Sequence, residues 1–404
     1  MSAKLAVAVL WALLVLPLAL SPLIGLFTPY LALLVIIPLF AATLVRSDRL
    51  SAWSSYDARA LLVVFAGLAV LFAITADSVS DDLRAFNFTM LLAYGPIALF
   101  LERRPTREPV TLTAVLASIG VIIGLVEVLI GLLTNQQPRP AGPNIGPIVL
   151  SNALLALGFV ALGGALVRRD RMGLLFLLAP VLSILATILT GSRGPLLSVP
   201  FAIVTAAVFF WRERFGRSIR AAVAGAAVLI VVLAGGAIAA LQGRAGSLLA
   251  IIGAASDGGA IVDESTRQRL VLYRAGWQSF LQSPWVGHGW GNLMQSIQPF
   301  LPPADAGLTT WLPQLHNDVL NFAVGAGVIG VALYVVIIST PIIAAALGPR
   351  DSLRPFRLYA ATVLTIVYVG GGLTDLMFGF EFHTYLFAML VAIVLHFCRD
   401  RTPA

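Results

Sequence analysis

Charge and cysteine are both scarce in this sequence. Only 11% of its 404 residues are charged, whereas 59% are apolar, and there is one cysteine, Cys398. Soluble domains carry roughly 25% charged residues, so the composition excludes a soluble globular protein. The single cysteine excludes an intrachain disulfide and a cysteine-based metal site. Internal repeats and low-complexity tracts are also lacking.

What the chain has instead is a series of long apolar stretches. A transmembrane helix takes about 20 mostly apolar residues. Twelve segments come close to that length, at about 5–22, 29–45, 59–76, 85–101, 110–133, 146–167, 172–190, 195–211, 220–241, 316–347, 357–377 and 384–397. We therefore predict an all-α fold, a polytopic integral membrane protein with about 12 transmembrane helices. Helices 1–9 occupy residues 1–241, a loop occupies 242–315, and helices 10–12 occupy 316–404.

Basic residues divide unevenly between the loops. With the N-terminus in the cytoplasm, 19 of the 26 basic residues lie in cytoplasmic segments and 7 lie outside. This is the usual bias of polytopic membrane proteins. The net charge of +7 therefore reflects topology, and we expect no nucleic-acid partner. Both termini are predicted to be cytoplasmic.

The loop at 242–315 is the longest, and long loops are usually functional. An apolar stretch at 247–255 is too short to span and is predicted to lie at the membrane interface or to re-enter. Residues 263–282 are predicted to form a helix that stops at Ser283-Pro284. Its apolar residues recur at helical spacing: Leu270, Tyr273, Trp277 and Phe280.

The outer face carries seven basic residues against the usual bias: Arg84, Arg139, Arg193, Arg244, Arg267, Arg269 and Arg274. Arg193 stands in the break Thr190-Gly191-Ser192-Arg193-Gly194-Pro195 between two predicted spans. A glycine-rich turn that opens a helix directs N–H groups and an arginine towards one place, which suits an anion. The alternative is an ordinary tight turn with an arginine at the level of the lipid headgroups.

His316 opens the tenth predicted span, as Leu315-His316-Asn317-Asp318, and Gly325, Gly327 and Gly330 follow it. Histidine is the side chain whose ordinary pKa makes it a base near neutral pH. Its position at the end of the long outer loop favours a catalytic role over the alternatives, an amphipathic anchor or a helix cap. His288 lies in a glycine-rich loop that only superficially resembles a dinucleotide fingerprint.

These blocks together resemble a known family. Their order and spacing look like those of the O-antigen ligase and polymerase family of bacterial inner-membrane glycosyltransferases. The blocks are the turn Ser192-Arg193-Gly194, Arg267 ahead of Trp277, the stretch Ser283-Pro284-Trp285-Val286-Gly287-His288-Gly289, and His316-Asn317-Asp318 through Gly327 and Gly330. The resemblance covers about 185–335. Many relatives carry an acidic residue two positions before the later glycine, and Gly325 stands there, so we assign that position no chemistry.

The resemblance implies a GT-C-like fold in the Gram-negative inner membrane with a periplasmic active site. One large outer loop resembles the ligases more than the polymerases, which more often use two loops. The implied reaction transfers the O-antigen from undecaprenyl pyrophosphate to a sugar hydroxyl of lipid A–core, beside membrane lipids. The alternatives are an O-antigen polymerase of the same family and, in a different class, a flippase for polyprenyl-linked glycans, which would not need a histidine at a loop–helix junction.

The residues can be assigned to this chemistry. Transfer from a pyrophosphate lipid needs a base, which we predict to be His316. It also needs positive charge beside the departing diphosphate, to stabilise the negative charge that develops there. We predict that Arg193 and Arg267 supply it. The further predicted substrate-binding residues are Arg269, Arg274, Asn317, Asp318 and Asp375. Without a carboxylate nucleophile, a single displacement inverts the anomeric centre.

Acidic residues outside that set need separate consideration. Asp77, Asp81 and Asp82 could hold a divalent metal, but the arginines already supply the counter-charge. We interpret the three as a hydrated acidic loop and expect neither a metal nor another cofactor. Glu127, inside a predicted span, and Asp375, at the outer end of another, are functional candidates because ionisable groups are costly in a membrane. Either of them could orient an arginine or His316.

Overall fold

The computed structural model describes residues 3–45, 49–134, 139–213 and 264–400, and these form helices and no strand. The α-helices are α1 (Ala3–Val15), α2 (Ser21–Ile24), α3 (Thr28–Val45), α4 (Tyr56–Thr75), α5 (Val79–Asp82), α6 (Thr89–Glu102), α7 (Pro109–Thr134), α8 (Pro147–Leu162), α9 (Gly164–Val167), α10 (Arg171–Leu175), α11 (Leu178–Leu189), α12 (Val199–Glu213), α15 (Glu264–Gln282), α16 (Leu293–Ile297), α17 (Leu308–Trp311), α18 (Asp318–Leu347), α19 (Arg354–Gly372) and α20 (Glu381–Ala392). Short 3₁₀ or π segments are η1 (Leu16–Leu20), η2 (Gly25–Phe27), η3 (Arg49–Trp53), η4 (Leu83–Phe88), η5 (Pro195–Ser198), η6 (Gln298–Phe300), η7 (Pro303–Asp305) and η8 (Ile393–Phe397). The predicted span 220–241 and the apolar stretch 247–255 lie outside the described residues.

The helical, polytopic character predicted from the sequence is confirmed. Seven described stretches are long and apolar enough to cross a membrane: Ala3–Val45, Tyr56–Thr75, Leu83–Glu102, Pro109–Thr134, Pro147–Val167, Arg171–Leu189 and Asp318–Leu347. The number twelve is not confirmed. The stretch Ala3–Val45 contains both of the first two predicted spans, because α1 and α3 lie on either side of a turn at Gly25 and pack against each other. Shorter apolar helices stand at Pro195–Trp211 and Glu381–Phe397.

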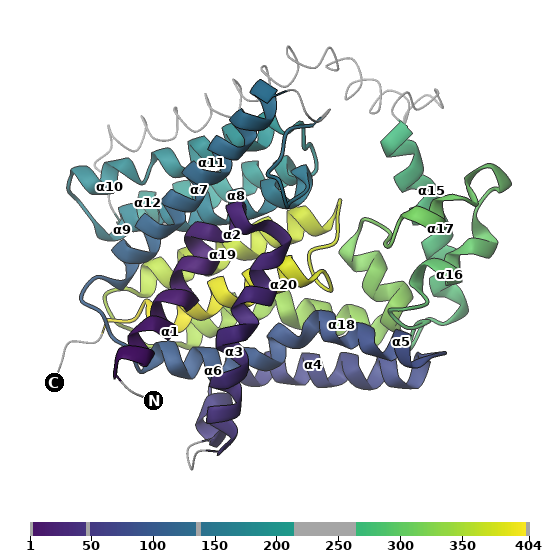
Figure 1. Cartoon of the computed structure of the whole chain (residues 1–404), viewed down its shortest axis with the longest axis horizontal. Helices are drawn as coiled ribbons and strands as arrows, with labels where there is room; N and C mark the ends of the chain where they lie inside the picture. The colour runs from purple at the N-terminus through teal and green to yellow at the C-terminus, as the bar shows by residue number, and fades with distance from the viewer. Residues whose placement is uncertain (1–2, 46–48, 135–138, 214–263, 401–404) are drawn as a thin grey trace.

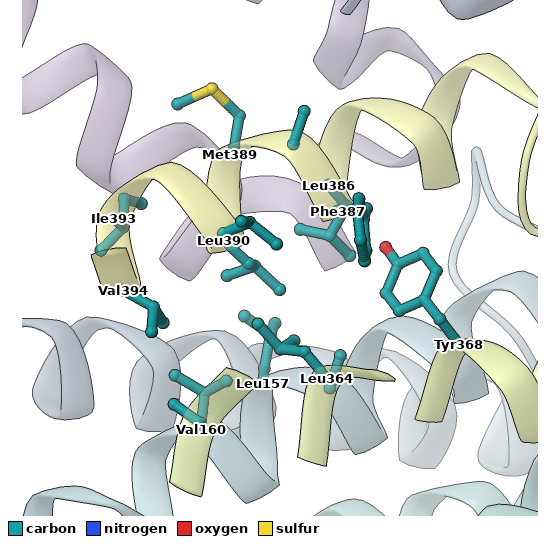
Figure 2. Close-up of a cluster of buried hydrophobic side chains, with 14 of the residues drawn as sticks. Leu157, Val160, Leu364, Tyr368, Leu386, Phe387, Met389, Leu390, Ile393 and Val394 are labelled. Carbon is teal, nitrogen blue, oxygen red and sulfur yellow. The ribbon is translucent and has the colours of Figure 1, made fainter. Parts of the chain in front are cut away.

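A fully buried helix occupies the centre of the bundle. Every residue of α20 from Phe382 to Ala392 is buried, as expected for a helix that is hydrophobic all round. Figure 2 shows Leu390 facing Leu157 of α8 and Leu364 of α19. The surrounding helices are therefore arranged around this late segment of the chain.

Polar side chains anchor the far end of the same segment. His396 Nε2 lies 2.6 Å from Asp57 Oδ2 of α4, and Tyr94 of α6 donates a hydrogen bond to the same oxygen at 2.5 Å. Arg399 donates to Glu102 Oε1 at 2.8 Å. Each buried polar group in this cluster thus has a partner, which avoids the cost of an unpaired charge in an apolar interior.

The long helix α18 is broken near its start, and a loop fits into the break. Gly327 has φ of +66°, and a Cβ there would overlap the carbonyl group of Trp285. The N–H groups of His288 and Gly289 donate to the carbonyls of Val324 and Gly325 at 2.8 and 3.0 Å. Val328 N in turn donates to Pro284 O at 2.8 Å. Backbone groups freed by the break are thereby satisfied, as an apolar environment requires.

The helix predicted at 263–282 is confirmed as α15, with Asp263 outside the described residues. Figure 1 shows α15, α16 and α17 gathered at one side of the molecule, away from α1. They share a small core of their own, made of Leu272, Leu293, Ile297, Leu301, Leu308 and Leu315. The buried side of α15 is Leu272, Ala275, Gly276 and Ser279. It is not the line of large apolar residues in the predicted pattern, because Leu270 and Trp277 of that line are exposed.

Candidate active site around His316

His316 has an unusual backbone that the surrounding residues hold in place. Its φ of +53° is left-handed, and it is the one residue other than glycine with positive φ in the described part of the chain. Such a conformation costs about 1–3 kcal/mol and persists where neighbours fix it, often at functional sites. Tyr273 of α15 donates to His316 O at 2.9 Å, and Asn321 Oδ1 accepts from the N–H of Leu315 at 3.0 Å.

Asp375 orients the imidazole ring. His316 Nδ1 lies 3.2 Å from Asp375 Oδ1, which also accepts from Gln314 Nε2 at 3.1 Å. Burial would raise the pKa of Asp375, but the hydrogen bond and charge of His316 outweigh it and hold the pKa below its usual value. An ionised carboxylate only accepts, so in the neutral form of the ring the proton is on Nδ1. The Nε2 lone pair is then available, and the His316 side chain is 20% exposed.

Asn317 and Asp318 hold the segments on either side of the His316–Asp375 pair together. Asn317 caps α18 by accepting from Leu320 N at 3.0 Å, and its amide donates to Leu373 O. Asp318 is fully buried, and its Oδ1 accepts from Met377 N at 2.8 Å. These contacts join the start of α18 to the segment that carries Asp375. They favour a supporting role over the substrate contact predicted for both residues.

The Arg193 turn packs beside the same segment. A Cβ at Gly194 would overlap the Thr374 hydroxyl, so the turn directly adjoins the residue before Asp375. Arg139, another of the arginines predicted to lie outside, donates to the carbonyl of Gly191 at 3.2 Å and to Ser192 Oγ at 3.1 Å. The turn that the sequence singled out is therefore fixed close to the His316–Asp375 pair.

Arg267 is engaged by two carboxylates. It donates to both oxygens of Glu264, at 2.8 and 2.7 Å, and to both oxygens of Asp305 of η7, at 3.1 and 2.7 Å. The hydrogen bonds from Glu264 and then Asp305 raise the pKa of the guanidinium. A diphosphate would have to displace these carboxylates to reach the planar fork of Arg267, which the sequence interpretation did not foresee.

The other two arginines of α15 lie on different sides of the helix. Arg269 is one turn before Tyr273, on the side that faces His316, and its charge acts on the Tyr273 hydroxyl. Burial is the larger influence and raises the pKa of Tyr273, so the phenol stays protonated as a donor. Arg274 is exposed. Of the two, Arg269 is better placed to meet an anion beside His316.

The remaining acidic candidates do not meet at this site. Asp77 accepts from Asn292 Nδ2 at 2.8 Å, and Asp81 accepts from Ser78 at 2.7 Å and packs on Gly291. Within the described ranges, no group of three or more His, Cys, Asp or Glu residues could hold a metal ion. Glu127 faces the loop at Gly142.

Comparison with known proteins fits this arrangement. Residues 176–335 match the model of a protein family described as O-antigen ligase. The match supports membership of the O-antigen ligase/polymerase family. It confirms the resemblance stated from the sequence. Comparison with curated proteins gives no match.

The family segment contains the Arg193 turn, α15 and His316, but it ends before Asp375. The family match and the apolar helices together support a multi-pass membrane protein of the O-antigen ligase/polymerase type. The span at 357–377 was predicted, but not the packing at the end of α19, where Gly370, Gly371 and Gly372 allow close approach of Ser198, Asn152 and Asp318. Three consecutive glycines at the end of an apolar run were the available clue.

Proposed function

We propose that this protein is an O-antigen ligase that transfers the glycan from undecaprenyl pyrophosphate to a sugar hydroxyl of lipid A–core on the periplasmic face. The proposal is carried by the state of His316. Its backbone is left-handed, its side chain is partly accessible, and its Nδ1 is hydrogen-bonded to the buried carboxylate of Asp375. The family match supports the reaction class. The proposed topology places both termini in the cytoplasm and α15 to α17 outside.

In the proposed reaction, His316 Nε2 accepts the proton of the acceptor hydroxyl. The hydroxyl oxygen forms a bond to the anomeric carbon as the bond from that carbon to the diphosphate oxygen breaks. The diphosphate leaves with the electron pair, and Asp375 stabilises the imidazolium that has formed. Attack on the face opposite the leaving group inverts the anomeric centre. Arg193 and Arg269 supply positive charge at the departing diphosphate.

A polymerase is the second candidate, because it uses the same lipid-linked donor and needs the same base. The two differ in the acceptor. Purified protein in lipid vesicles, given labelled lipid-linked donor and lipid A–core, should release undecaprenyl pyrophosphate and label the core. Longer lipid-linked chains would indicate a polymerase, and donor moved between leaflets without cleavage would indicate a flippase.

Arg267 and Asp305 give a direct test of what Arg267 does. If Arg267 joins α15 to η7, Asp305→Asn should reproduce much of the loss of thermal stability and of transfer caused by Arg267→Ala, because each breaks the same ion pair. If Arg267 binds the diphosphate, only Arg267→Ala should weaken donor affinity. Donor affinity and melting temperature measured on both variants distinguish these results, and Arg274→Ala serves as an exposed arginine control.

Transfer should need no divalent cation. In this proposal the arginines take the role that a metal would have, and the carboxylates of Asp77 and Asp81 already accept hydrogen bonds from neighbouring side chains. The transfer rate should be unchanged in excess chelator. A loss that magnesium or manganese restores would contradict this and direct attention to the acidic loop at 77–82.

A further inference from the structure

The helix α15 has a second apolar side that faces away from the protein. Leu270, Trp277 and Leu281 are 39%, 53% and 51% exposed, and Trp285 just beyond the helix is 71% exposed. Spacings of seven and eleven residues from Leu270 place Trp277 and Leu281 along one line of the helix, and Trp285 follows in the turn after Ser283-Pro284. Soluble surfaces rarely expose several large apolar side chains together in this way, and such a group usually marks an interaction site.

The rotation of α15 is fixed by its opposite side. Ala275 and Gly276 are buried, and a Cβ at Gly276 would lie 2.9 Å from Leu320 and 3.0 Å from Leu315. Only a small residue allows this approach of α15 to α18. The helix therefore cannot turn its tryptophan and leucine inwards without separating from α18, and the exposed line is a constant feature of this packing.

The exposed line joins the side of a membrane span. Trp285 O accepts from Ile329 N at 3.5 Å, and Pro284 O accepts from Val328 N, so these backbones lie side by side. Val328 and Ile329 are themselves exposed, as are Val335 and Leu347 further along α18. From Val328 to Leu347 the helix has about 20 residues, which corresponds to about 30 Å and to the thickness of the hydrocarbon layer. Trp285 is then level with the outer boundary of that layer.

We propose that the strip formed by Leu270, Trp277 and Leu281 of α15, together with Trp285 just beyond the helix, lies in the outer leaflet of the membrane and contacts the acyl chains of its lipids. Tryptophan is enriched at this depth because its ring has an apolar body and a polar N–H. Arg274, exposed on the same line as Trp277 and Leu281, meets the lipid phosphates there, as basic residues of interfacial helices do. The helix that carries Tyr273 to His316 is thus held against the bilayer, whichever glycan is transferred.

Fluorescence quenching by brominated phospholipids tests this placement. In a Cys398→Ser background, an environment-sensitive nitrobenzoxadiazole probe is attached at Leu281→Cys, and the full-length protein is placed in nanodiscs of phosphatidylethanolamine and phosphatidylglycerol. Exchange for brominated lipid should reduce emission at this position nearly as much as at Val335→Cys on the exposed side of α18. A probe at Ala304→Cys, exposed in η7, should keep its emission and be quenched by aqueous iodide instead.

Two results would overturn the proposal. Quenching at Leu281→Cys by iodide and not by brominated lipid would place the strip in water. Protection from both quenchers would mean that protein covers it, for example a second copy of the chain. A second probe at Trp277→Cys repeats the measurement should Leu281→Cys fold poorly, and size-exclusion elution identifies a misfolded variant.

Discussion

His316→Ala should lower the single-turnover transfer rate by about 10²–10⁴, the loss expected for a missing general base. Affinity for the lipid-linked donor should remain near that of the unchanged protein, because the proposed diphosphate ligands are arginines. Quenched-flow turnover beside a donor-binding assay measures the two effects separately. Near-normal turnover in His316→Ala would show that His316 is only a structural residue at the start of α18.

The left-handed backbone of His316 requires a matched control. Alanine tolerates a φ of +53° poorly, whereas asparagine adopts it more readily but cannot act as a base. His316→Asn should therefore keep the fold and lose turnover to the same extent. Asp375→Asn should also slow turnover, because its amide can donate to Nδ1 and favours the tautomer in which Nε2 carries the proton. In the His316→Ala background the Asp375 change should have little further effect.

Gly327→Ala should abolish transfer by displacing the loop that fits into α18. The residue has φ of +66°, and an added Cβ would overlap the Trp285 carbonyl. Left-handed strain and overpacking each cost about 1–3 kcal/mol. The loss of the Val328 and Ile329 hydrogen bonds to this loop would add to that. We expect a lower melting temperature and faster proteolysis between Ser283 and Gly289.

Gly307→Ala is the matched control for that variant. Gly307 has φ of −66°, and a Cβ there would meet nothing within 4 Å. This substitution should leave melting temperature and transfer unchanged. Equal behaviour of the two variants would contradict the proposed docking of the loop on the broken helix.

Local features of the fold were predictable from the sequence, because they depend on neighbouring residues. Apolar runs of sufficient length predicted the helices, and Ser283-Pro284 predicted where α15 ends. The buried side of α15 was not predictable, since it is chosen by the fit of Gly276 against Leu320, and the alternative face is the more hydrophobic one. The break at Gly327 was likewise hidden, because a glycine in an apolar run is usually tolerated within a helix.

Individual residues of the candidate site were predicted from the sequence, but the contacts between them were not. His316, Arg193 and Asp375 were each singled out by where they stand relative to the spans. The pairing of His316 with Asp375 joins residues 59 positions apart, and sequence spacing over that distance says little about contact. The engagement of Arg267 by Asp305, 38 positions away, was missed for the same reason.

The central position of α20 bears on how the protein assembles. Among the described helices it is the last to be synthesised, yet α6, α8 and α19 pack around it. Earlier helices enter the membrane with a space between them that lipid or loosely packed side chains must fill until α20 arrives. His396 can then pair with Asp57, which lies in the first quarter of the chain and is synthesised much earlier. The bundle is therefore complete only after α20 has packed. A chain stopped before α20 should be recognised as incompletely folded and degraded, even though most of its spans have been inserted.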